Sequence, residues 1–429
     1  MISTYSQAIE FLTSAPSFMD KEEQITNLKL LLHALGNPQE KVRAIHVAGT
    51  NGKGSVCAYF NKILVDTGYK TGLFTSPYLV DFCERIQINN EMICKEDVAE
   101  LVERVRKVSD ELNVTMSQFA YITAIMFLYF AQNNVDYAVI EVGLGGRFDP
   151  TVLCEPCLCA ITSISADHTA ILGSDRAEIA REKAGIIKKG ITTVSALQYP
   201  DAEAVIVDTA QNACADLFIV NANNVTIDDN KTEFYFEDEH YSISMLGEYQ
   251  AQNAVIAIKG AALLGINGKD IKKSVADTVW RGRLQRIYRS PCVLVDGAHN
   301  PDAAKKLKQF FKSINKKAII ICAMVQDKDT DGAIKHFADF AQYVYCVNMN
   351  TPRRASRVAL LTAFNNNGIC GETCENALDA LGSAVKLWKE RFDDDTAIVV
   401  CGSLYLVGEF LSYSEVEIEK RITDSKGNV

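Results

Sequence analysis

The sequence predicts an α/β protein of two domains, and three observations lead to this fold class. The chain has 429 residues, which is more than a single hydrophobic core usually serves. Strand-like and helix-like segments alternate along it, the pattern of a mainly parallel sheet covered by helices. The alternation starts again after Pro291, and the residues that remain are numerous enough to build a core of their own.

We assign residues 1–283 to an N-terminal mononucleotide-binding domain with a mostly parallel sheet. Its expected strands are 42–48, 70–74, 137–142 and 157–164, and its expected helices are 54–67, 97–112, 117–132 and 250–264. The helix over 117–132 is nearly apolar on all sides, so we expect it to be buried. Apolar and polar residues alternate over 228–245, which predicts a hairpin and a small antiparallel edge.

Residues 284–292 are expected to link this domain to a Rossmann-like C-terminal domain over 293–429. The strands expected in the second domain are 293–296, 318–323, 343–348 and 398–401. Open sheets of this kind bind their ligands beyond the carboxyl ends of the strands. Polar residues that follow the expected strands are therefore the candidates for a functional site.

The composition excludes several classes of function. A net charge of −10 argues against a protein that holds nucleic acid on a basic face. No apolar run is long enough to span a bilayer, and the strongest, over 119–131, has the length of a buried helix. Thirteen cysteines without zinc-finger spacing or a secretory leader indicate reduced thiols. We expect a cytoplasmic monomer that binds neither nucleic acid nor a membrane.

The most informative segment is a glycine-rich turn, which reads Gly49-Thr50-Asn51-Gly52-Lys53-Gly54-Ser55 and follows the first strand. The backbone N–H groups of such a turn, with the helix N-terminus behind it, bind the phosphates of ATP. Lys53 would reach the outer phosphates, and Ser55 would offer its oxygen to Mg²⁺. The strict Walker spacing is not met, because Val47 occupies the first glycine position and Gly54 follows the lysine. A glycine turn without a ligand is the alternative.

Further polar residues of the first domain form a candidate metal site. Ser76, Glu141 and His168 each stand at or after the end of an expected strand. Mg²⁺ prefers oxygen ligands and usually keeps water beside one carboxylate and phosphate oxygens, so Ser55, Ser76 and Glu141 suit it. Histidine is an unusual ligand of magnesium, and a hydrogen-bonded core histidine is the alternative for His168.

The second domain offers a polar turn, Asp296-Gly-Ala-His299-Asn300-Pro301, after its opening strand. An aspartate and a histidine in one tight turn suit the ribose and the phosphates of a nucleotide. The alternative is a turn with a purely structural helix cap, because Asn300-Pro301 can begin a helix.

Six segments of the chain occur in an order typical of one family. They are AGTNGKGS (48–55), TSP (75–77), ERI (84–86), EVGLGGR (141–147), EKAG (182–185) and DGAHNP (296–301). With these segments the chain resembles, over nearly its whole length, the folylpolyglutamate synthase family of Mur-ligase-like, ATP-dependent amide ligases. The Gly-Thr-Asn-Gly-Lys turn is this family's form of the phosphate-binding loop, which accounts for the departure from the Walker spacing.

The resemblance implies two Mg²⁺ ions and a modified lysine. The first ion would bind Ser55, Ser76 and Glu141, and the second would bind Glu141 and His168. Lys183 would be carbamylated, which turns a cation into a carboxylate-like group near the second metal. An unmodified lysine beside Mg²⁺ would be repelled, so the alternative for Lys183 is a surface salt bridge to Glu182 or Glu178.

The resemblance also implies the remaining contacts with the nucleotide and the substrates. Adenine would contact Asn253, the triphosphate Arg283, the ribose Asp296 and the phosphates His299. Arg85 and Ser403 are the candidates for holding the incoming glutamate, and Phe119 opens the segment that lines the pterin side. The expected catalytic residues are Lys53, Arg85, His168 and Lys183.

The implied reaction is an ATP-dependent ligation. ATP would phosphorylate the γ-carboxylate of a (tetrahydro)folate, and the amine of L-glutamate would attack the acyl phosphate. One alternative is dihydrofolate synthase activity on dihydropteroate, alone or in a bifunctional enzyme. A peptidoglycan-precursor ligase would be expected to carry a UDP-sugar-binding domain before the phosphate loop. A nucleotide switch without ligase activity would need neither Lys183 nor a second nucleotide-contacting domain.

The chain departs from the family pattern on the pterin side. Tyr78 replaces a common histidine, Ala120 stands where glutamate is frequent, and Val152 stands where asparagine is usual. The segment near residues 19–21 lacks a usual glycine pattern. These departures leave the ATP-binding motifs intact and bear on the choice of substrate.

Overall fold

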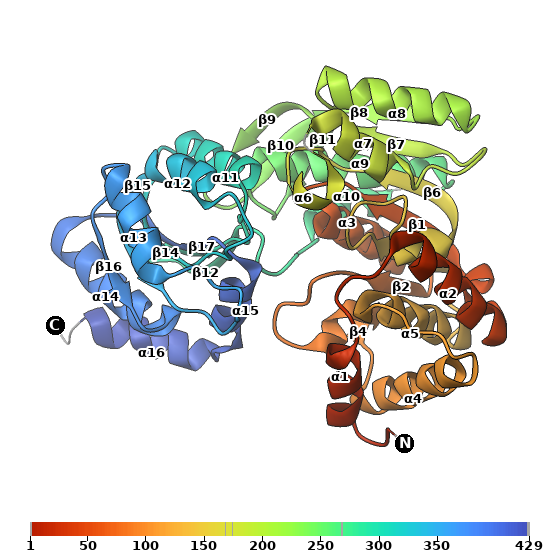
Figure 1. The fold of residues 1–429 in the computed structure, drawn as a ribbon. Coiled ribbons are helices and arrows are strands. Elements are labelled where there is room, and N and C mark those ends of the chain that lie inside the picture. The colour runs from red at the N-terminus through yellow and green to blue at the C-terminus, as the bar shows by residue number, and fades with distance from the viewer. Residues whose placement is uncertain (1, 168, 174, 267–268, 427–429) are drawn as a thin grey trace. The chain divides into compact units, whose positions relative to one another are not determined.

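We describe a computed structural model of the chain, which covers residues 2–167, 169–173, 175–266 and 269–426. Its contacts divide the chain into two compact units, Met1–Asn221 with Gln252–Val275, and Ala222–Ala251 with Ala276–Val429. Each unit contains a mostly parallel sheet with helices packed against it (Figure 1). The predicted α/β class is therefore confirmed.

The first unit contains an eight-stranded sheet. In spatial order its strands are β4 (Glu91–Met92), β3 (Ile86–Ile88), β2 (Thr71–Phe74), β5 (Tyr137–Glu141), β1 (Arg43–Ala48), β6 (Glu155–Ile161), β7 (Thr193–Ala196) and β8 (Leu217–Val220). Strands β2, β5, β1, β6, β7 and β8 are parallel, whereas β3 and β4 add an antiparallel edge. The short strands β7 and β8 were not anticipated by the alternation of the sequence.

Helices and short 3-10 turns surround this sheet. They are α1 (Tyr5–Ser14), α2 (Lys21–Ala34), η1 (Pro38–Lys41), α3 (Lys53–Asp66), η2 (Phe82–Arg85), α4 (Lys95–Glu111), α5 (Gln118–Gln132), η3 (Pro150–Leu153), α6 (Thr169–Leu172), α7 (Arg176–Ala184), α8 (Pro200–Asn212), α9 (Glu248–Leu263) and α10 (Lys269–Ala276). Helix α5 is buried along most of its length, as its apolar sequence predicts. It packs so closely on β2 that a Cβ atom at Gly72 would lie 2.8 Å from the ring of Phe130.

The second unit contains a six-stranded sheet and a separate three-stranded antiparallel sheet. The larger sheet has the order β12 (Gln285–Tyr288), β13 (Val293–Val295), β17 (Thr396–Cys401), β14 (Lys317–Cys322), β15 (Ala341–Val347) and β16 (Gly371–Cys374), and the smaller one consists of β11 (Glu239–Ile243), β10 (Thr232–Phe236) and β9 (Asn223–Ile227). The helices are α11 (Pro301–Ser313), α12 (Thr330–Ala338), α13 (Arg357–Asn366), α14 (Ala377–Arg391), α15 (Leu404–Ser412) and α16 (Glu415–Lys426).

Two expectations about the domain organisation are wrong. Residues 284–292 are not a bare linker, because β12 pairs antiparallel with β13 and extends the sheet. The hairpin expected over 228–245 forms as β10 and β11, but it does not add an edge to the first sheet. It groups with the second unit because Lys316 forms an ion pair with Asp229 at 2.9 Å and Arg286 donates to Asn230 at 2.9 Å.

None of the helices within the described ranges combines the length and the apolar character that crossing a bilayer requires. The apolar residues lie instead in the cores that join the helices to the sheets. One such core unites α2, α4 and α5 with the buried faces of β1, β2 and β5, and another unites α11 and α12 with β14 and β17.

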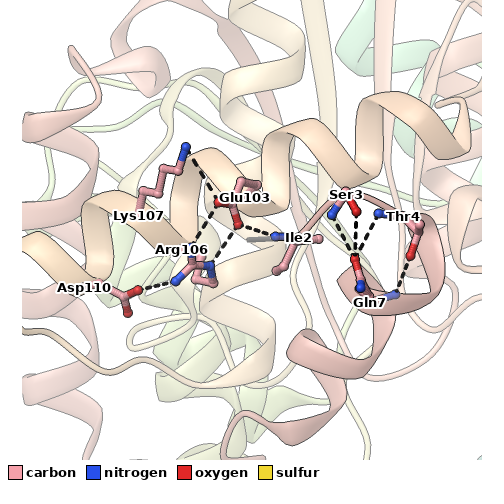
Figure 2. A network of polar contacts seen from close by, with 8 residues as sticks. All are labelled: Ile2, Ser3, Thr4, Gln7, Glu103, Arg106, Lys107 and Asp110. Carbon is pink, nitrogen blue, oxygen red and sulfur yellow. Dashed lines mark hydrogen bonds and ion pairs between the residues drawn. The ribbon is translucent and has the colours of Figure 1, made fainter.

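The N-terminal segment is tied to α4 by one carboxylate, that of Glu103 (Figure 2). Glu103 accepts the backbone N–H of Ile2 at 2.8 Å and two hydrogen bonds from Arg106, at 2.9 and 3.0 Å. Lys107 approaches the other oxygen at 3.7 Å. Hydrogen bonding from Arg106, followed by that from Ile2, lowers the pKa of Glu103 to about 2. The docking of the segment before α1 is therefore held by an ionised carboxylate.

We predict that Glu103→Gln lowers the melting temperature at pH 7, because the amide cannot serve four charge-assisted contacts. The folded pKa lies below the ordinary value of 4.5, so the contribution is complete above about pH 4.5 and is lost as the pH falls toward 2. The difference in melting temperature between the two proteins should shrink over that range. Glu100→Gln on the same helix is the control, and an equal effect of both substitutions would contradict the assignment.

Candidate active site

The turn between β1 and α3 adopts a backbone that requires glycine. Gly49 and Gly52 have φ angles of 145° and 93°, in a region that side chains with a Cβ rarely adopt. A Cβ atom at Gly49 would collide with Thr162, and one at Gly52 would collide with the amide of Asn253 on α9. The expected adenine contact Asn253 is therefore packed directly against the phosphate-binding turn.

The turn is fixed by the segment that follows β6. Thr162 Oγ1 donates to the carbonyl of Asn51 at 2.7 Å, and the N–H of Thr50 donates to the carbonyl of Ser163 at 2.9 Å. Thr50 Oγ1 donates in turn to the carbonyl of Ser165 at 3.0 Å. These three hydrogen bonds anchor the turn to the segment that follows β6.

Helix α3 begins directly at this turn. No side chain caps its first turn at Gly52, so the N–H groups and the positive end of the helix dipole face the loop. Lys53 Nζ folds back and donates to the carbonyls of Gly49 and Thr50, both at 3.2 Å. Gly54 and Ser55 lie in the same buried helical turn. A positive helix end and an ammonium group thus meet at one point, the arrangement that binds phosphate.

Glu141 lies beside this turn because β5 is the neighbour of β1. Val47 and Glu141 are paired in register, and Glu141 is only 5% exposed. One of its carboxylate oxygens accepts the backbone N–H of Ser76 at 2.9 Å. Ser55 is buried in the first turn of α3. Cys57 follows in the same helix, and the charge of Glu141 adds to burial in raising the pKa of its thiol. Glu141 is thus bonded to the backbone of Ser76 and lies on the strand next to β1, which leads into the turn before Ser55.

Lys183 of α7 reaches the same turn from the other side. It is 4% exposed, and its Nζ donates to the carbonyl of Gly49 at 2.8 Å. Burial, with the nearby charge of Lys53, lowers the pKa of Lys183 to about 7, although Asp167, Asp149 and Glu182 oppose the shift. The alternative of a surface salt bridge for Lys183 is wrong, because the side chain points inward.

Glycines let α7 approach the loop that follows β5. A Cβ atom at Gly146 would lie 2.8 and 2.9 Å from the carbonyls of Glu182 and Lys183, and one at Gly185 would lie 2.6 Å from the Cα atom of Arg147. The N–H of Arg147 donates to the carbonyl of Glu182 at 2.8 Å. The segment 143–146 thus serves to place Lys183, a role that its sequence alone does not reveal.

Asp149 organises this loop and was not expected among the site residues. It is buried, and its oxygens accept the N–H groups of Leu144 at 2.9 Å and Thr151 at 3.0 Å. The hydroxyl of Thr151 donates to Asp149 at 2.5 Å and accepts from His46 Nε2 at 2.9 Å. Burial lowers the pKa of His46 to about 3 and raises that of Asp149. The Asp-Pro sequence before η3, typical of a helix cap, is the signal that points to Asp149.

His168, expected as a metal ligand or a core histidine, lies outside the described residues. Its neighbour Asp167 is described, and its charge acts on Lys183. Among the described side chains, no group of three or more His, Cys, Asp or Glu is arranged to hold a metal ion. The candidate donors Ser55, Ser76 and Glu141 include only one of those residue types.

In the second unit, Asp296 follows β13 and is buried. Its oxygens accept the N–H groups of Leu284 and Ala298, both at 2.8 Å, and the hydroxyl of Tyr249 at 3.4 Å. Burial raises the pKa of Asp296, and the positive charge of Arg283 opposes that shift. The guanidinium of Arg283 is so close to the turn that a Cβ atom at Gly297 would lie 2.6 Å from one of its nitrogens.

His299 and Ser403 lie at the same edge of that sheet. His299 Nδ1 contacts the carbonyl of Gly297 at 2.9 Å, while Asn300 caps α11 by accepting the N–H of Ala303 at 2.9 Å. Ser403 follows β17, the neighbour of β13, and caps α15. The structural alternative for this turn, a helix cap, is therefore correct for Asn300.

Arg85 and Phe119, the remaining substrate candidates, both belong to the first unit. Arg85 stacks on the rings of Tyr78 and Phe82, with its Cζ 5.1 and 6.0 Å from their centroids. Phe119 lies 5.8 Å from the ring of Phe74 and so close to Gly143 that a Cβ atom there would be 2.6 Å from its ring.

A cavity of about 820 Å³ lies elsewhere in the first unit. Its lining includes Ile25 and Lys29 of α2, Arg147, Phe148 and Lys188. Val152, one of the departures from the family pattern, also lines it, but the expected site residues do not. The candidate site is therefore defined by the converging turns and strand ends and not by this cavity.

Comparison with known proteins identifies the family of the chain. The Mur ligase middle domain matches residues 47–261, and the Mur ligase, glutamate ligase domain matches residues 282–404. The chain is 32% identical to a dihydrofolate synthase/folylpolyglutamate synthase of Bacillus subtilis, covering 95% of this chain and 99% of that protein. It is 33% identical to a folylpolyglutamate synthase of Lacticaseibacillus casei, covering 94% and 96% of the two chains.

Solved structures give the same result. The folylpolyglutamate synthase of Mycobacterium tuberculosis complexed with ADP superposes with a TM-score of 0.88 at 29% identity, covering 95% of this chain and 97% of that chain. FolC of E. coli in complex with DHPP and ADP superposes with a TM-score of 0.82 at 26% identity, covering 98% and 99%. The chain therefore belongs to the Mur ligases and, within them, to the folylpolyglutamate synthase/dihydrofolate synthase family.

Proposed function

We propose that this protein is an ADP-forming ligase that adds L-glutamate to the γ-carboxylate of a (tetrahydro)folate. Dihydrofolate synthase activity, which joins glutamate to dihydropteroate, is the second candidate, because relatives of both activities match the chain over most of its length. The observation that carries the proposal is the convergence of two lysines on one phosphate-binding turn. Lys53 and Lys183 both donate to the carbonyl of Gly49, at 3.2 and 2.8 Å.

A carboxylate does not react with an amine in water, because its oxygen is a poor leaving group. Transfer of the terminal phosphoryl group of ATP to the carboxylate forms an acyl phosphate and ADP. The glutamate amine attacks the acyl carbon, loses a proton, and the C–O bond to phosphate breaks. Lys53 and the N-terminus of α3 stabilise the negative charge that gathers on the transferred group. The glycine turn is preorganised for this task by the hydrogen bonds that it makes with the segment after β6.

The residues at the edge of the first sheet fit Mg²⁺. Ser55, Ser76 and Glu141 carry oxygen donors with a single carboxylate, which suits an ion that also keeps water and phosphate oxygens. Bound there, Mg²⁺ would neutralise charge on the triphosphate. The N–H of Ser76 fixes one oxygen of Glu141 and so orients the carboxylate. A second ion, with Glu141 and His168 as its ligands, is part of the proposal.

Lys183 has the properties of an amine that reacts with CO₂. With a pKa of about 7, a large share of the amine is neutral at physiological pH, and only the neutral form attacks CO₂. An N–C bond forms, a proton is released, and the product is a carbamate anion. This anion would replace the repulsion between Lys183 and Lys53 by attraction, and its oxygens would suit a metal ion.

The second unit contributes Arg283, Asp296 and His299 to nucleotide binding in this proposal, as Asn253 does in the first unit. Arg85 and Ser403 would bind glutamate, and Phe119 would line the pterin side. All thirteen cysteines are free thiols, which supports a reducing compartment such as the cytoplasm. We also propose that the enzyme acts as a monomer.

The two candidate activities are distinguished by substrate-dependent release of ADP. We expect ADP release only when ATP, Mg²⁺, glutamate and the acceptor are all present. Tetrahydrofolate as the effective acceptor would identify a folylpolyglutamate synthase, dihydropteroate a dihydrofolate synthase, and both a bifunctional enzyme. ADP release that is independent of acceptor and glutamate would contradict a ligase and indicate a nucleotide switch.

Lys53→Ala should lower kcat by about 10²- to 10³-fold or more, since it removes a charge aimed at the reacting phosphate. The measurement is amide product per unit time, with circular dichroism to show that the fold persists. Lys62→Ala is the matched control, because Lys62 lies on the same helix and pairs with Asp66 at the surface. Undiminished turnover in Lys53→Ala would exclude the phosphate role.

Lys183→Ala should lower activity about 10- to 100-fold, the usual cost of losing a group that supports a metal site. A short carboxylic acid should restore part of it. In the wild type, ¹³C-bicarbonate should give a carbamate NMR signal that grows as the pH rises through about 7, because deprotonation exposes the amine. Lys189→Ala, which alters an exposed lysine nearby, should keep both properties. Full activity of Lys183→Ala would exclude the carbamate.

A further inference from the structure

The loop over residues 75–85 carries Arg85 against two aromatic rings. The Cζ atom of Arg85 lies 5.1 Å from the centroid of Tyr78 and 6.0 Å from that of Phe82. The two rings are 6.2 Å apart at an interplanar angle of 68°. A guanidinium group over the face of an aromatic ring is attracted by the ring quadrupole. The two rings therefore restrict the directions that this cation can take.

The backbone of the loop is itself clamped, so the rings are fixed in place. The carboxylate of Glu84 accepts the N–H groups of Leu79, Val80 and Asp81 at 2.8, 3.0 and 3.1 Å. The N–H of Thr75 donates to the carbonyl of Arg85 at 3.0 Å and closes the loop at its base. A loop with this many internal hydrogen bonds can hold a side chain precisely.

Helix α1 braces the loop from outside. The hydroxyl of Tyr5 donates to Asp81 at 3.2 Å, and Lys95 approaches the other oxygen of Asp81 at 3.7 Å. The segment before α1 is anchored in turn by Ile2 on Glu103 (Figure 2). The N-terminal region thus supports the part of the chain that presents Arg85.

The base of the loop lies at the candidate active site. Phe74 and Ile86 are paired in register, which places Thr75 opposite Arg85. The next residue, Ser76, donates its N–H to Glu141 at 2.9 Å. The backbone of Arg85 is therefore hydrogen-bonded to the residue next to Ser76, which in turn is hydrogen-bonded to Glu141.

Burial in the hydrophobic core explains the position of Phe82 but not that of Tyr78. Phe82 is 7% exposed and belongs to the hydrophobic core with α4 and α5, so packing accounts for it. Tyr78 is 41% exposed and gains little from burial. Its aromatic contacts are with Phe82 and with the guanidinium of Arg85. The contact with Arg85 is thus a feature of this exposed ring that burial does not account for.

We propose that Tyr78 is a positioning residue for the amino-acid substrate, because its ring orients the guanidinium of Arg85 toward a substrate carboxylate. The inference rests on the proposed function, in which Arg85 binds the incoming glutamate. The aromatic ring of Tyr78, and not its hydroxyl, holds the guanidinium of Arg85, because the attraction comes from the ring quadrupole.

The test is the steady-state kinetics of Tyr78→Ala and Tyr78→Phe with glutamate, acceptor and ATP varied in turn. An exposed cation–π contact corresponds to about a 2- to 5-fold effect on binding. We expect Tyr78→Ala to raise KM for glutamate by about that factor with kcat unchanged, the pattern of a contact made equally in ground and transition states. Tyr78→Phe should behave as the wild type.

Tyr199→Ala is the matched control, because Tyr199 is also exposed, at 49%, and stacks on an arginine, Arg176, at 4.0 Å. It should leave every kinetic constant unchanged. An unchanged KM for glutamate in Tyr78→Ala, or a rise confined to the acceptor or ATP, would overturn the role of Tyr78 while the proposed function stands. Absence of glutamate-dependent turnover in the wild type would overturn both.

Discussion

The candidate site depends on one buried hydrogen bond, from Lys183 Nζ to the carbonyl of Gly49 at 2.8 Å. It joins α7 to the phosphate-binding turn across the end of β1. Helix α7 can reach this position because Gly146 and Gly185 have no side chains to keep it away from the loop after β5. The turn, the strand end with Glu141 and the helix with Lys183 are consequently parts of one rigid arrangement.

This arrangement places the positive charges of Lys53 and Lys183 close together. Their repulsion lowers the stability of the fold and disfavours the charged form of Lys183. Burial and the charge of Lys53 both disfavour the ammonium form of Lys183, and the pKa falls to about 7. Such a perturbed amine is typical of functional sites. Asp149 and Asp167 oppose the shift, so the surrounding carboxylates hold the amine near the point at which both protonation states are populated. Burial, with the charge of Lys188, likewise lowers the pKa of His46 to about 3.

Tyr78, Ala120 and Val152, the expected departures from the family pattern, lie in three different surroundings. Tyr78 has a specific neighbour in Arg85, and Val152 lines a cavity apart from the expected site residues. Ala120 is fully buried in the first turns of α5, where a larger polar residue would have to find partners. The nucleotide-binding turn, by contrast, keeps the contacts that its glycines allow.

The sequence by itself determined the α/β class, the strands of both sheets that carry the site, and the turn that ends in Lys53, because these features depend on local periodicity and on glycine. It did not determine that β12 joins the second sheet or that β7 and β8 exist, because short strands are defined by the strands with which they pair. It also did not determine that the hairpin over 232–243 groups with the second unit. Tertiary structure also decided three features of the site. They are the burial of the Lys183 side chain, the hydrogen bond from Ser76 to Glu141 and the network around Asp149. The bonds from Lys183 to Gly49, from Ser76 to Glu141 and from His46 to Thr151 join residues 134, 65 and 105 positions apart, and only packing brings such residues within hydrogen-bonding distance.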